Sequence, residues 1–333
     1  MKRNMKQWAA ELIAAPAKKP FPILSFPSAQ LLGISVRELI SSSESQAQGM
    51  KLIADRVDAA ASVSLMDLSV EAEAFGSAIR VSDNEVPTVI GAIVTGAEEA
   101  DALEIPPVGA ARTGLYVDSI RKAAQLITDR PVFAGTIGPY SLAGRLLDVS
   151  EIMLLCFDEP DLVHTVLRKT TAFLINYISA YKAAGANGVI VAEPLVGLLS
   201  PTLAESFCAP YMKQIVDTVQ DEEFLVIYHN CGDNVLRMAD SIVSCGAAGY
   251  HFGNAIRLAD MLPLIPAACL VLGNVDPAVE LCSGTPESVY DSTRKVIKEC
   301  GHAPNFCISS GCDIPPKTPW SNIDAFFAAA TET

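Results

Sequence analysis

From about residue 130 to the end of the chain, short apolar runs alternate with segments of helical periodicity. The apolar runs are continuous, which is typical of parallel strands covered on both faces. They predict strands over residues 131–139, 188–194, 224–230, 249–254, 269–277 and 306–313. The helical segments between and after them lie at 150–185 (with a break near Pro160), 202–220, 234–246, 285–301 and 320–332.

Repeated strand–helix units, without a dinucleotide-binding glycine motif, favour a TIM (β/α)8 barrel over an open sheet. The N-terminal third fits the same plan, with strands predicted at 21–26 and 62–70 and a helix at 45–61. Residues 77–113 are irregular and contain several prolines, so we expect an excursion over one end of the barrel.

An N-terminal helical extension is predicted before the barrel, within residues 1–16. This segment is basic and then amphipathic, and it lacks the apolar core and cleavage site of a signal peptide. No shift of composition, repeat or linker divides the chain. We therefore expect a single domain over residues 1–333, in the cytoplasm.

Composition limits the partners. Half of the 333 residues are hydrophobic, which is enough for a large core. Lys and Arg total 24 against 38 Asp and Glu, and the net charge of −14 argues against nucleic acid and anionic membranes as main partners. No apolar stretch approaches the ~20 residues of a membrane span. Nine cysteines without an export signal predict free thiols rather than disulfides.

Active sites of TIM barrels lie at the C-terminal ends of the strands, so polar side chains there are the candidates. Glu193, Asn274 and Asp276 are predicted to be catalytic polar groups at the barrel mouth. An alternative for the last two is a turn before Pro277. His251 and Asn254, in the strand predicted at 249–254, are predicted to contact a cofactor or substrate.

One histidine and two cysteines form a candidate metal site. His229 and Cys231 are two positions apart on a strand end, so both side chains point to the same side. Cys312 lies at the end of a later strand, after a glycine that permits a sharp turn. A Cys₂His set suits Zn²⁺, with Glu193 as a candidate fourth ligand. Cys307 competes with Cys312 but lies inside its strand. Alternatively, His229 is a hydrogen-bonded barrel histidine and Cys231 a packing residue.

Two thiolates neutralise a zinc ion, which makes it a poor activator of water. A substrate thiol that binds in an open position still loses its proton. Alkylation of that sulfur by an activated methyl group is therefore favoured over hydrolysis.

Several segments resemble one known family in their order along the chain. They are "MDLSVEAEAFG" (66–76), "GPYSLAGRLLDVSEIML" (138–154), "AEPLVGLLSP" (192–201), "HNCGDNV" (229–235), "GNVDPAVEL" (273–281) and "SSGCDIPPKTP" (309–319). The chain resembles the uroporphyrinogen decarboxylase superfamily, and within it the zinc-dependent corrinoid methyltransferases, which include methylcobalamin:coenzyme M methyltransferases.

This resemblance implies a TIM barrel that takes a methyl group from methylcobalamin or a methylated corrinoid protein. The methyl group would pass to a small-molecule thiol on a zinc ion held by His229, Cys231 and Cys312. The acceptor stays open between coenzyme M, homocysteine, a folate and another thiol.

Two other functions remain open. A cofactor-free decarboxylase would use Asp67, Arg112 and Arg145, but that branch relies on an N-terminal arginine cluster that "KKPFPILSFPSAQLLG" lacks. A non-catalytic protein could instead dock a corrinoid protein through its acidic surface and residues 77–113.

Overall fold

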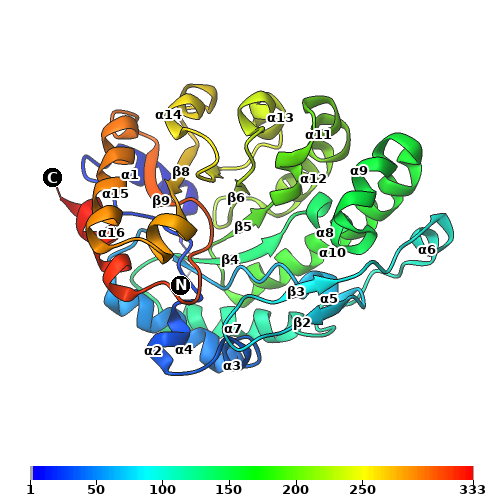
Figure 1. Cartoon of the computed structure of the whole chain (residues 1–333), viewed down its shortest axis with the longest axis horizontal. Coiled ribbons are helices and arrows are strands. Elements are labelled where there is room, and N and C mark those ends of the chain that lie inside the picture. Colours follow the sequence, from blue (N-terminus) through cyan, green and yellow to red (C-terminus); the bar gives the residue numbers. More distant parts are fainter. Residues whose placement is uncertain (1–2, 333) are drawn as a thin grey trace.

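The computed structural model describes residues 3–332, and within them seven parallel strands form one curled sheet with helices outside it (Figure 1). The strand order is β1-β4-β5-β6-β7-β8-β9. Their bounds are Ser62–Val63 (β1), Val132–Ile137 (β4), Gly188–Ala192 (β5), Leu225–Asn230 (β6), Gly249–Phe252 (β7), Leu270–Val275 (β8) and Phe306–Ser310 (β9). The predicted α/β barrel class is confirmed.

Residues 21–26 were predicted to form a strand, and this prediction is wrong. The segment is extended and lies between β9 and the chain before β1: Phe21 N donates to Ile308 O, and Ala60 N donates to Pro20 O. Pro22 has no N–H, so a regular ladder cannot form. Ile23 N instead donates to Ser310 Oγ at 3.2 Å. An irregular segment therefore occupies the eighth position of the barrel.

Most helices lie on the outer side of the sheet. Those of the N-terminal half are α1 (Met5–Ala14), α2 (Ser28–Leu32), α3 (Val36–Ile40), α4 (Ser43–Arg56), α5 (Val70–Ala74), α6 (Ala97–Ala102), α7 (Thr113–Leu126) and α8 (Pro139–Leu147). The rest are α9 (Val149–Asp158), α10 (Pro160–Ala184), α11 (Pro201–Phe207), α12 (Ala209–Val219), α13 (Ala239–Val243), α14 (Leu258–Met261), α15 (Pro286–Cys300) and α16 (Trp320–Thr331).

Short helices connect several of these elements. They are η1 (Pro194–Leu198), η2 (Val235–Met238), η3 (Leu262–Leu264) and η4 (Pro277–Cys282).

Local chemistry explains many helix starts. Thr285 caps α15 by accepting from Ser288 N, and Pro286 occupies the first turn. The break predicted near Pro160 divides α9 from α10. The N-terminal helix is α1, and Met1 and Lys2 of its predicted range lie outside the described residues.

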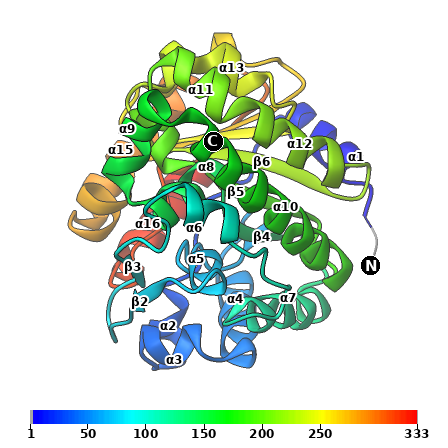
Figure 2. The same ribbon diagram turned by 90° about the vertical axis from the view of Figure 1, so that its right-hand side faces the viewer.

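Two N-terminal predictions need correction. Residues 62–70 were predicted as one strand, but only Ser62–Val63 pair with β4. Asp67 Oδ1 accepts from Ser69 N at 3.1 Å, and this local bond turns the chain into α5. The excursion at 77–113 contains an antiparallel hairpin, β2 (Ala78–Arg80) with β3 (Thr88–Ile90), followed by α6. Figures 1 and 2 place the hairpin beside α5.

Alternate residues along each strand point to opposite faces of the sheet and belong to two different apolar clusters. One cluster lies between the sheet and the helices. The other fills the barrel interior and includes Ile190, Leu225, Ile227, Leu272 and Cys307. Because residues 225 and 227 face inward, residue 229 on β6 faces inward too. The interior core thus lies directly below the C-terminal strand ends.

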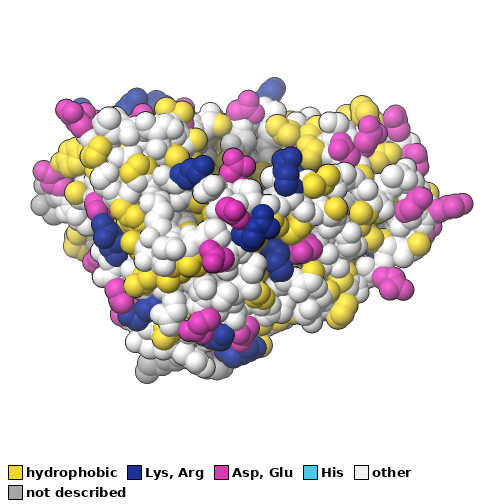
Figure 3. All heavy atoms as spheres, turned by 60° about the horizontal axis from the view of Figure 1, so that its bottom comes forward, with side chains coloured by type: hydrophobic (Ala, Val, Ile, Leu, Met, Phe, Trp, Pro, Cys, Tyr) yellow, Lys and Arg dark blue, Asp and Glu magenta, His cyan; other side chains and the backbone are white. Residues whose placement is uncertain are grey.

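Surface features agree with the composition. No helix in residues 3–332 is long and apolar enough to cross a membrane. On the face in Figure 3, basic side chains lie interspersed with acidic ones rather than in one continuous basic surface. All nine cysteines are free thiols.

Candidate metal centre

His229, Cys231 and Cys312 meet at the C-terminal end of the barrel. His229 lies in β6, Cys231 follows that strand directly, and Cys312 follows β9. One ligand atom from each lies within 4.8 Å of the others, and among residues 3–332 they form the one group of three with this geometry. The three side chains therefore lie together, and their role as metal ligands stays a prediction.

The spacing of the ligand atoms suits a tetrahedral zinc ion. Cys312 Sγ lies 3.4 Å from His229 Nε2. Zinc–sulfur and zinc–nitrogen bonds of about 2.3 and 2.1 Å at a tetrahedral angle place S and N about 3.6 Å apart. His229 is buried, whereas Cys231 and Cys312 are partly exposed, so solvent reaches the sulfur side of the group. The donor set and its spacing therefore fit zinc with an accessible fourth position.

A chain of hydrogen bonds holds the His229 ring from behind. His229 and His251 are register partners on β6 and β7. Their Nδ1 atoms are 2.8 Å apart, and His251 Nε2 lies 2.8 Å from Ser309 Oγ on β9. Burial lowers the pKa of His251 well below its usual value, so this ring is neutral. One consistent pattern has His229 Nδ1–H donating to His251 Nδ1 and His251 Nε2–H donating to Ser309, which leaves His229 Nε2 free for a metal.

The two thiols share one hydrogen bond. It lowers the pKa of Cys231, which the neighbouring His229 lowers further, and it raises the pKa of Cys312. The shared hydrogen bond therefore favours the thiolate form of Cys231, which is the form that binds a metal ion.

Hydrogen bonds made by the backbone of neighbouring residues fix the positions of Cys231 and Cys312. Asn230 Oδ1 accepts from Gly232 N at 2.9 Å and turns the chain around Cys231. Gly311 N donates to Val275 O, and Ile314 N donates to Ile23 O, so Cys312 lies between two anchored residues. Neighbouring strand ends are also in close contact: a Cβ at Gly253 would lie 2.5 Å from Cys231 Cα. Glycine at 253 is required for this approach.

Glu193 lies at the end of β5, but its carboxylate points to α8. Its Oε1 and Oε2 accept from the backbone amides of Tyr140 and Ser141 at 2.9 and 2.8 Å. Burial raises its pKa to about 7. Glu193 is not part of the three-residue group, and its contacts here are those of a carboxylate at a helix N-terminus.

Asn274 lies near the end of β8, and Asn254 and Asp276 lie on the loops after β7 and β8. Asp276 Oδ1 accepts from Ala278 N and Val279 N, which caps η4. Its Oδ2 accepts from Asn254 Nδ2 at 2.8 Å. Asn274 Nδ2 donates to the carbonyls of Gly253 and Ile256. The Asp276 contacts match the turn alternative, and all three side chains stabilise the loops beside the metal centre.

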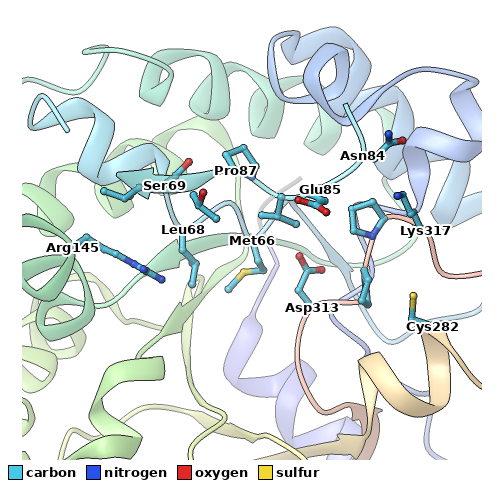
Figure 4. Close-up of a pocket in the computed structure, with 15 residues that line it drawn as sticks. Met66, Leu68, Ser69, Asn84, Glu85, Pro87, Arg145, Cys282, Asp313 and Lys317 are labelled. Atoms are coloured by element: carbon cyan, nitrogen blue, oxygen red, sulfur yellow. The ribbon is translucent and has the colours of Figure 1, made fainter. Parts of the chain in front are cut away.

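A pocket of about 500 Å³ opens at the same end of the barrel. Figure 4 shows Met66 and Leu68 at the centre of the pocket, with Glu85 and Pro87 on one side. Asp313, which follows Cys312 in the sequence, also lines the pocket. Arg145 reaches into it from α8, and Lys317 stands at its other side. Burial raises the pKa of Asp313 well above its usual value. The pocket has the size of a small-molecule site.

Asp67 and Arg112 are bound to each other. The Arg112 guanidinium forms ion pairs with Asp67 and with Glu73, the latter at 2.6 Å. Tyr116 Oη donates to Asp67 at 2.7 Å, and the Asp67 side chain is fully buried. Of the three residues predicted for a decarboxylase, Arg145 lines the pocket, and its guanidinium has no partner among residues 3–332.

Sequence patterns did not identify Ser309 and Asp313. Ser309 is two residues before Gly311 in a strand that reads as core, and its role depends on His251 of a neighbouring strand. Asp313 was visible next to Cys312, but whether it faced a pocket could not be read from the sequence.

The uroporphyrinogen decarboxylase (URO-D) family model matches residues 23–333. The chain belongs to this family. Its relatives include proteins with two different activities, a methyltransferase and a decarboxylase. Methylcobamide:CoM methyltransferase MtbA of Methanosarcina acetivorans is 27% identical over 270 residues, covering 79% of this chain and 77% of that protein. Uroporphyrinogen decarboxylase of Coxiella burnetii is 28% identical over 287 residues, covering 81% and 76%.

A solved methyltransferase from Methanosarcina mazei shares the fold. Its TM-score is 0.86 at 21% identity, over 99% of this chain and 98% of that one. Sequence identity is nearly equal toward the two kinds of relative, so it does not separate the two activities within the URO-D family. The two activities therefore have to be distinguished by the side chains at the barrel mouth.

Proposed function

We propose that this enzyme transfers a methyl group from a methylated corrinoid, carried by a corrinoid protein, to the sulfur of a small thiol. The observation that carries the proposal is the meeting of His229 Nε2 with the sulfurs of Cys231 and Cys312 within 4.8 Å. A Cys₂His group next to a small-molecule pocket is suited to zinc and to a sulfur nucleophile. The methyltransferase relatives support this activity.

Each residue of the site has a distinct task in this proposal. His229, Cys231 and Cys312 would hold the zinc ion, and His251 with Ser309 would fix the ring of His229. A zinc ion bound there would hold an incoming thiol as its thiolate at neutral pH. The pocket beside Cys312 would position the rest of the thiol and keep its sulfur in line with the methyl donor.

Uroporphyrinogen decarboxylation fits the side chains less well. A tetrapyrrole with many carboxylates needs several free cationic groups. Arg112 is neutralised by Asp67 and Glu73, and the N-terminal segment offers no arginine cluster. The pocket is lined by two cations, Arg145 and Lys317, of which Lys317 is exposed. We therefore favour methyl transfer.

Metal analysis and a methyl-transfer assay test the proposal together. We expect about one zinc per chain, and demethylation of methylcobalamin in the presence of 2-mercaptoethanesulfonate. Cys231→Ala and Cys312→Ala each remove a thiolate ligand, and both are expected to lose the zinc and at least ~100-fold in rate.

Cys269→Ala is the matched control, because this partly buried thiol lies before β8 and outside the metal centre. It should keep both zinc and activity. A native preparation free of zinc, or carbon dioxide release from uroporphyrinogen without methyl transfer, would contradict the proposal.

A further inference from the structure

Helix α9 carries two large apolar side chains on its outer face. Phe157 is 71% exposed and Leu154 is 57% exposed, and their spacing of three residues places them on one side of the helix. Ile152 and Cys156 are buried on the opposite side. Among the large hydrophobic side chains of residues 3–332, Phe157 has the greatest exposed fraction. Neighbouring apolar side chains left in water are typical of a protein–protein interface.

Helix η1 brings the same kind of surface to the metal centre. Gly197 of η1 approaches Gly232, the residue after Cys231, so closely that a Cβ at position 197 would lie 2.5 Å from Gly232 Cα. The next residue of η1, Leu198, is 55% exposed. An exposed apolar side chain therefore lies beside the loop that carries one of the candidate metal ligands.

Helix α8 connects η1 with α9. A Cβ at Gly144 of α8 would lie 2.5 Å from Leu195 Cδ1 of η1 and 3.4 Å from Ile152 Cγ2 of α9, so the three helices meet at this glycine. Figure 2 shows α9 on the same side of the barrel as the hairpin β2–β3, whereas α1 lies at the opposite end. Leu154, Phe157 and Leu198 therefore form one apolar surface at the mouth of the barrel, which we call the apolar rim.

Acidic side chains without basic partners surround α9. Residues 148–161 contain no Lys or Arg, and their acids are all exposed: Asp148, Glu151, Asp158, Glu159 and Asp161. None of these acids forms an ion pair within residues 3–332. At the right-hand end of Figure 3, where α6 and α9 lie, acidic side chains gather without basic ones.

This charge decides which kind of partner fits the apolar rim. A negative field repels nucleic acid, anionic membranes and a second copy of the same surface. It attracts a protein whose own apolar contact residues are surrounded by Lys and Arg, and such a protein would gain both apolar burial and opposite charges on binding.

We propose that the apolar rim binds the corrinoid protein, and that the contact surface of that protein is apolar at its centre and basic around it. This inference rests on the proposed function. Methyl transfer requires the methyl group of the corrinoid to reach the sulfur at the metal centre, so its carrier has to dock at this end of the barrel. Helix α9 lies beside the mouth, where it contacts the carrier and not the reacting atoms.

The test compares two methyl donors on the zinc-loaded protein, with 2-mercaptoethanesulfonate as the acceptor. One donor is free methylcobalamin. The other is the methylated corrinoid protein of the organism that makes this chain, purified by its corrinoid absorbance. In the double variant Leu154→Ser with Phe157→Ser, kcat/KM for the protein donor should fall roughly 10- to 100-fold, because the interface loses two apolar anchors. The value for free methylcobalamin should stay unchanged.

Leu264→Ser is the matched control. This leucine is 47% exposed and lies in η3, shortly before β8 begins and so away from the C-terminal strand ends. The control variant should use both donors as the wild type does.

The acids are tested separately through salt. With the protein donor, kcat/KM of the wild type should fall as sodium chloride is raised, because salt screens the attraction between the two surfaces. The double variant Glu151→Gln with Asp158→Asn should show a weaker salt dependence. With free methylcobalamin, salt should affect the wild type and this variant equally.

A further measurement does not depend on turnover. Calorimetric titration with the unmethylated corrinoid protein should show binding to the wild type, and binding weaker by roughly 10-fold or more in Leu154→Ser with Phe157→Ser. Sedimentation of the chain alone should give the same oligomeric state for the wild type and this variant.

The outcomes separate this inference from the proposed function. If the Leu154→Ser, Phe157→Ser variant uses and binds the corrinoid protein as the wild type does, or if Leu264→Ser loses as much, the apolar rim is not the docking surface and methyl transfer still stands. An equal loss with both donors, or a changed oligomeric state, also overturns the inference. If the wild type demethylates neither donor, the proposed function fails, and calorimetry still decides whether the apolar rim binds the corrinoid protein.

Discussion

At the scale of residues, the two ring nitrogens of His229 face different partners. Nε2 faces the Cys312 sulfur, and Nδ1 faces His251, which in turn contacts Ser309. A ligand histidine that is held in this way keeps its tautomer and its ring orientation without further cost when a metal binds. The contribution of His251 should therefore appear in metal affinity.

His251→Leu keeps the volume of the side chain but removes both ring nitrogens. We expect zinc affinity to fall by roughly 10- to 100-fold, because the His229 ring loses its support. Competition with a chromogenic chelator measures this. The zinc-free variant should still fold, as judged by circular dichroism. Unchanged zinc affinity in a folded variant would show that His251 only fills space.

Glu71 is a buried carboxyl that makes stability depend on pH. Its Oε1 accepts from Thr136 Oγ1 at 2.6 Å, and its Oε2 has no hydrogen-bond partner among the described residues. Burial raises its pKa from 4.5 to about 7. The folded state therefore favours the protonated form, and the stability gained below the unfolded pKa is lost as the pH rises through 7.

Glu71→Gln should remove this part of the pH dependence. Between pH 5 and pH 8 the wild type should lose about 2 to 3 kcal/mol more unfolding free energy than the variant. Urea unfolding at the two pH values measures the difference. Glu151→Gln, at an exposed position of α9, should follow the wild type. A Glu71→Gln curve parallel to that of the wild type would contradict the assignment.

At the scale of elements, the loop after β1 is tied to α5 and α7 by one buried ionic group. Arg112, at the start of α7, pairs with Asp67 in the loop and with Glu73 of α5. The side chain of Arg112 is 14% exposed and that of Asp67 is fully buried. Removing one partner of such a pair leaves a charge without compensation in a medium of low polarity.

Arg112→Leu should reduce the unfolding free energy by about 3 to 5 kcal/mol, because Asp67 stays buried and unpaired. The double variant Arg112→Leu with Asp67→Asn should recover part of this loss, as urea unfolding would show. Arg37→Leu is the matched control: its pair with Asp83 is more than half exposed, and its loss should cost less than about 1 kcal/mol. An equal loss in both single variants would contradict this prediction.

Strand and helix order in the C-terminal two thirds could be predicted because each element carries its own apolar period and its own breakers. The N-terminal third was harder for a physical reason. In 21–26 Pro22 removes a ladder donor, and in 62–70 the Asp67 side chain competes with the sheet for the backbone. Helix α7 was absent from the prediction, because it follows the irregular stretch without a clear start signal.

At the scale of the whole molecule, the metal centre joins three regions of the chain: β6, the loop after β9, and the extended segment at 21–26, which binds Ile314 next to the centre. A ligand that binds only the folded chain stabilises all of it by mass action. We expect the chain to unfold as one domain, and zinc to raise the temperature of that transition.

Scanning calorimetry of zinc-loaded and chelator-treated protein checks this expectation. At a free zinc concentration about 100-fold above its dissociation constant, the gain should be about 2.7 kcal/mol. Cys312→Ala should show no such gain, whereas Cys269→Ala should show all of it. Two separate transitions, or an equal zinc effect in Cys312→Ala, would contradict the expectation.

The sequence by itself determined the order of the strands from about residue 130 onward and the three side chains that converge. Both follow from local periodicity: His229 and Cys231 share a side of one strand, and parallel strands of a barrel end at one mouth. Only the tertiary structure decided that Arg112 is paired while Arg145 has no partner among residues 3–332, that Glu193 points to α8, and that His251 supports His229. Those outcomes depend on which side chains from distant segments become neighbours in space, and no local pattern in the chain encodes that.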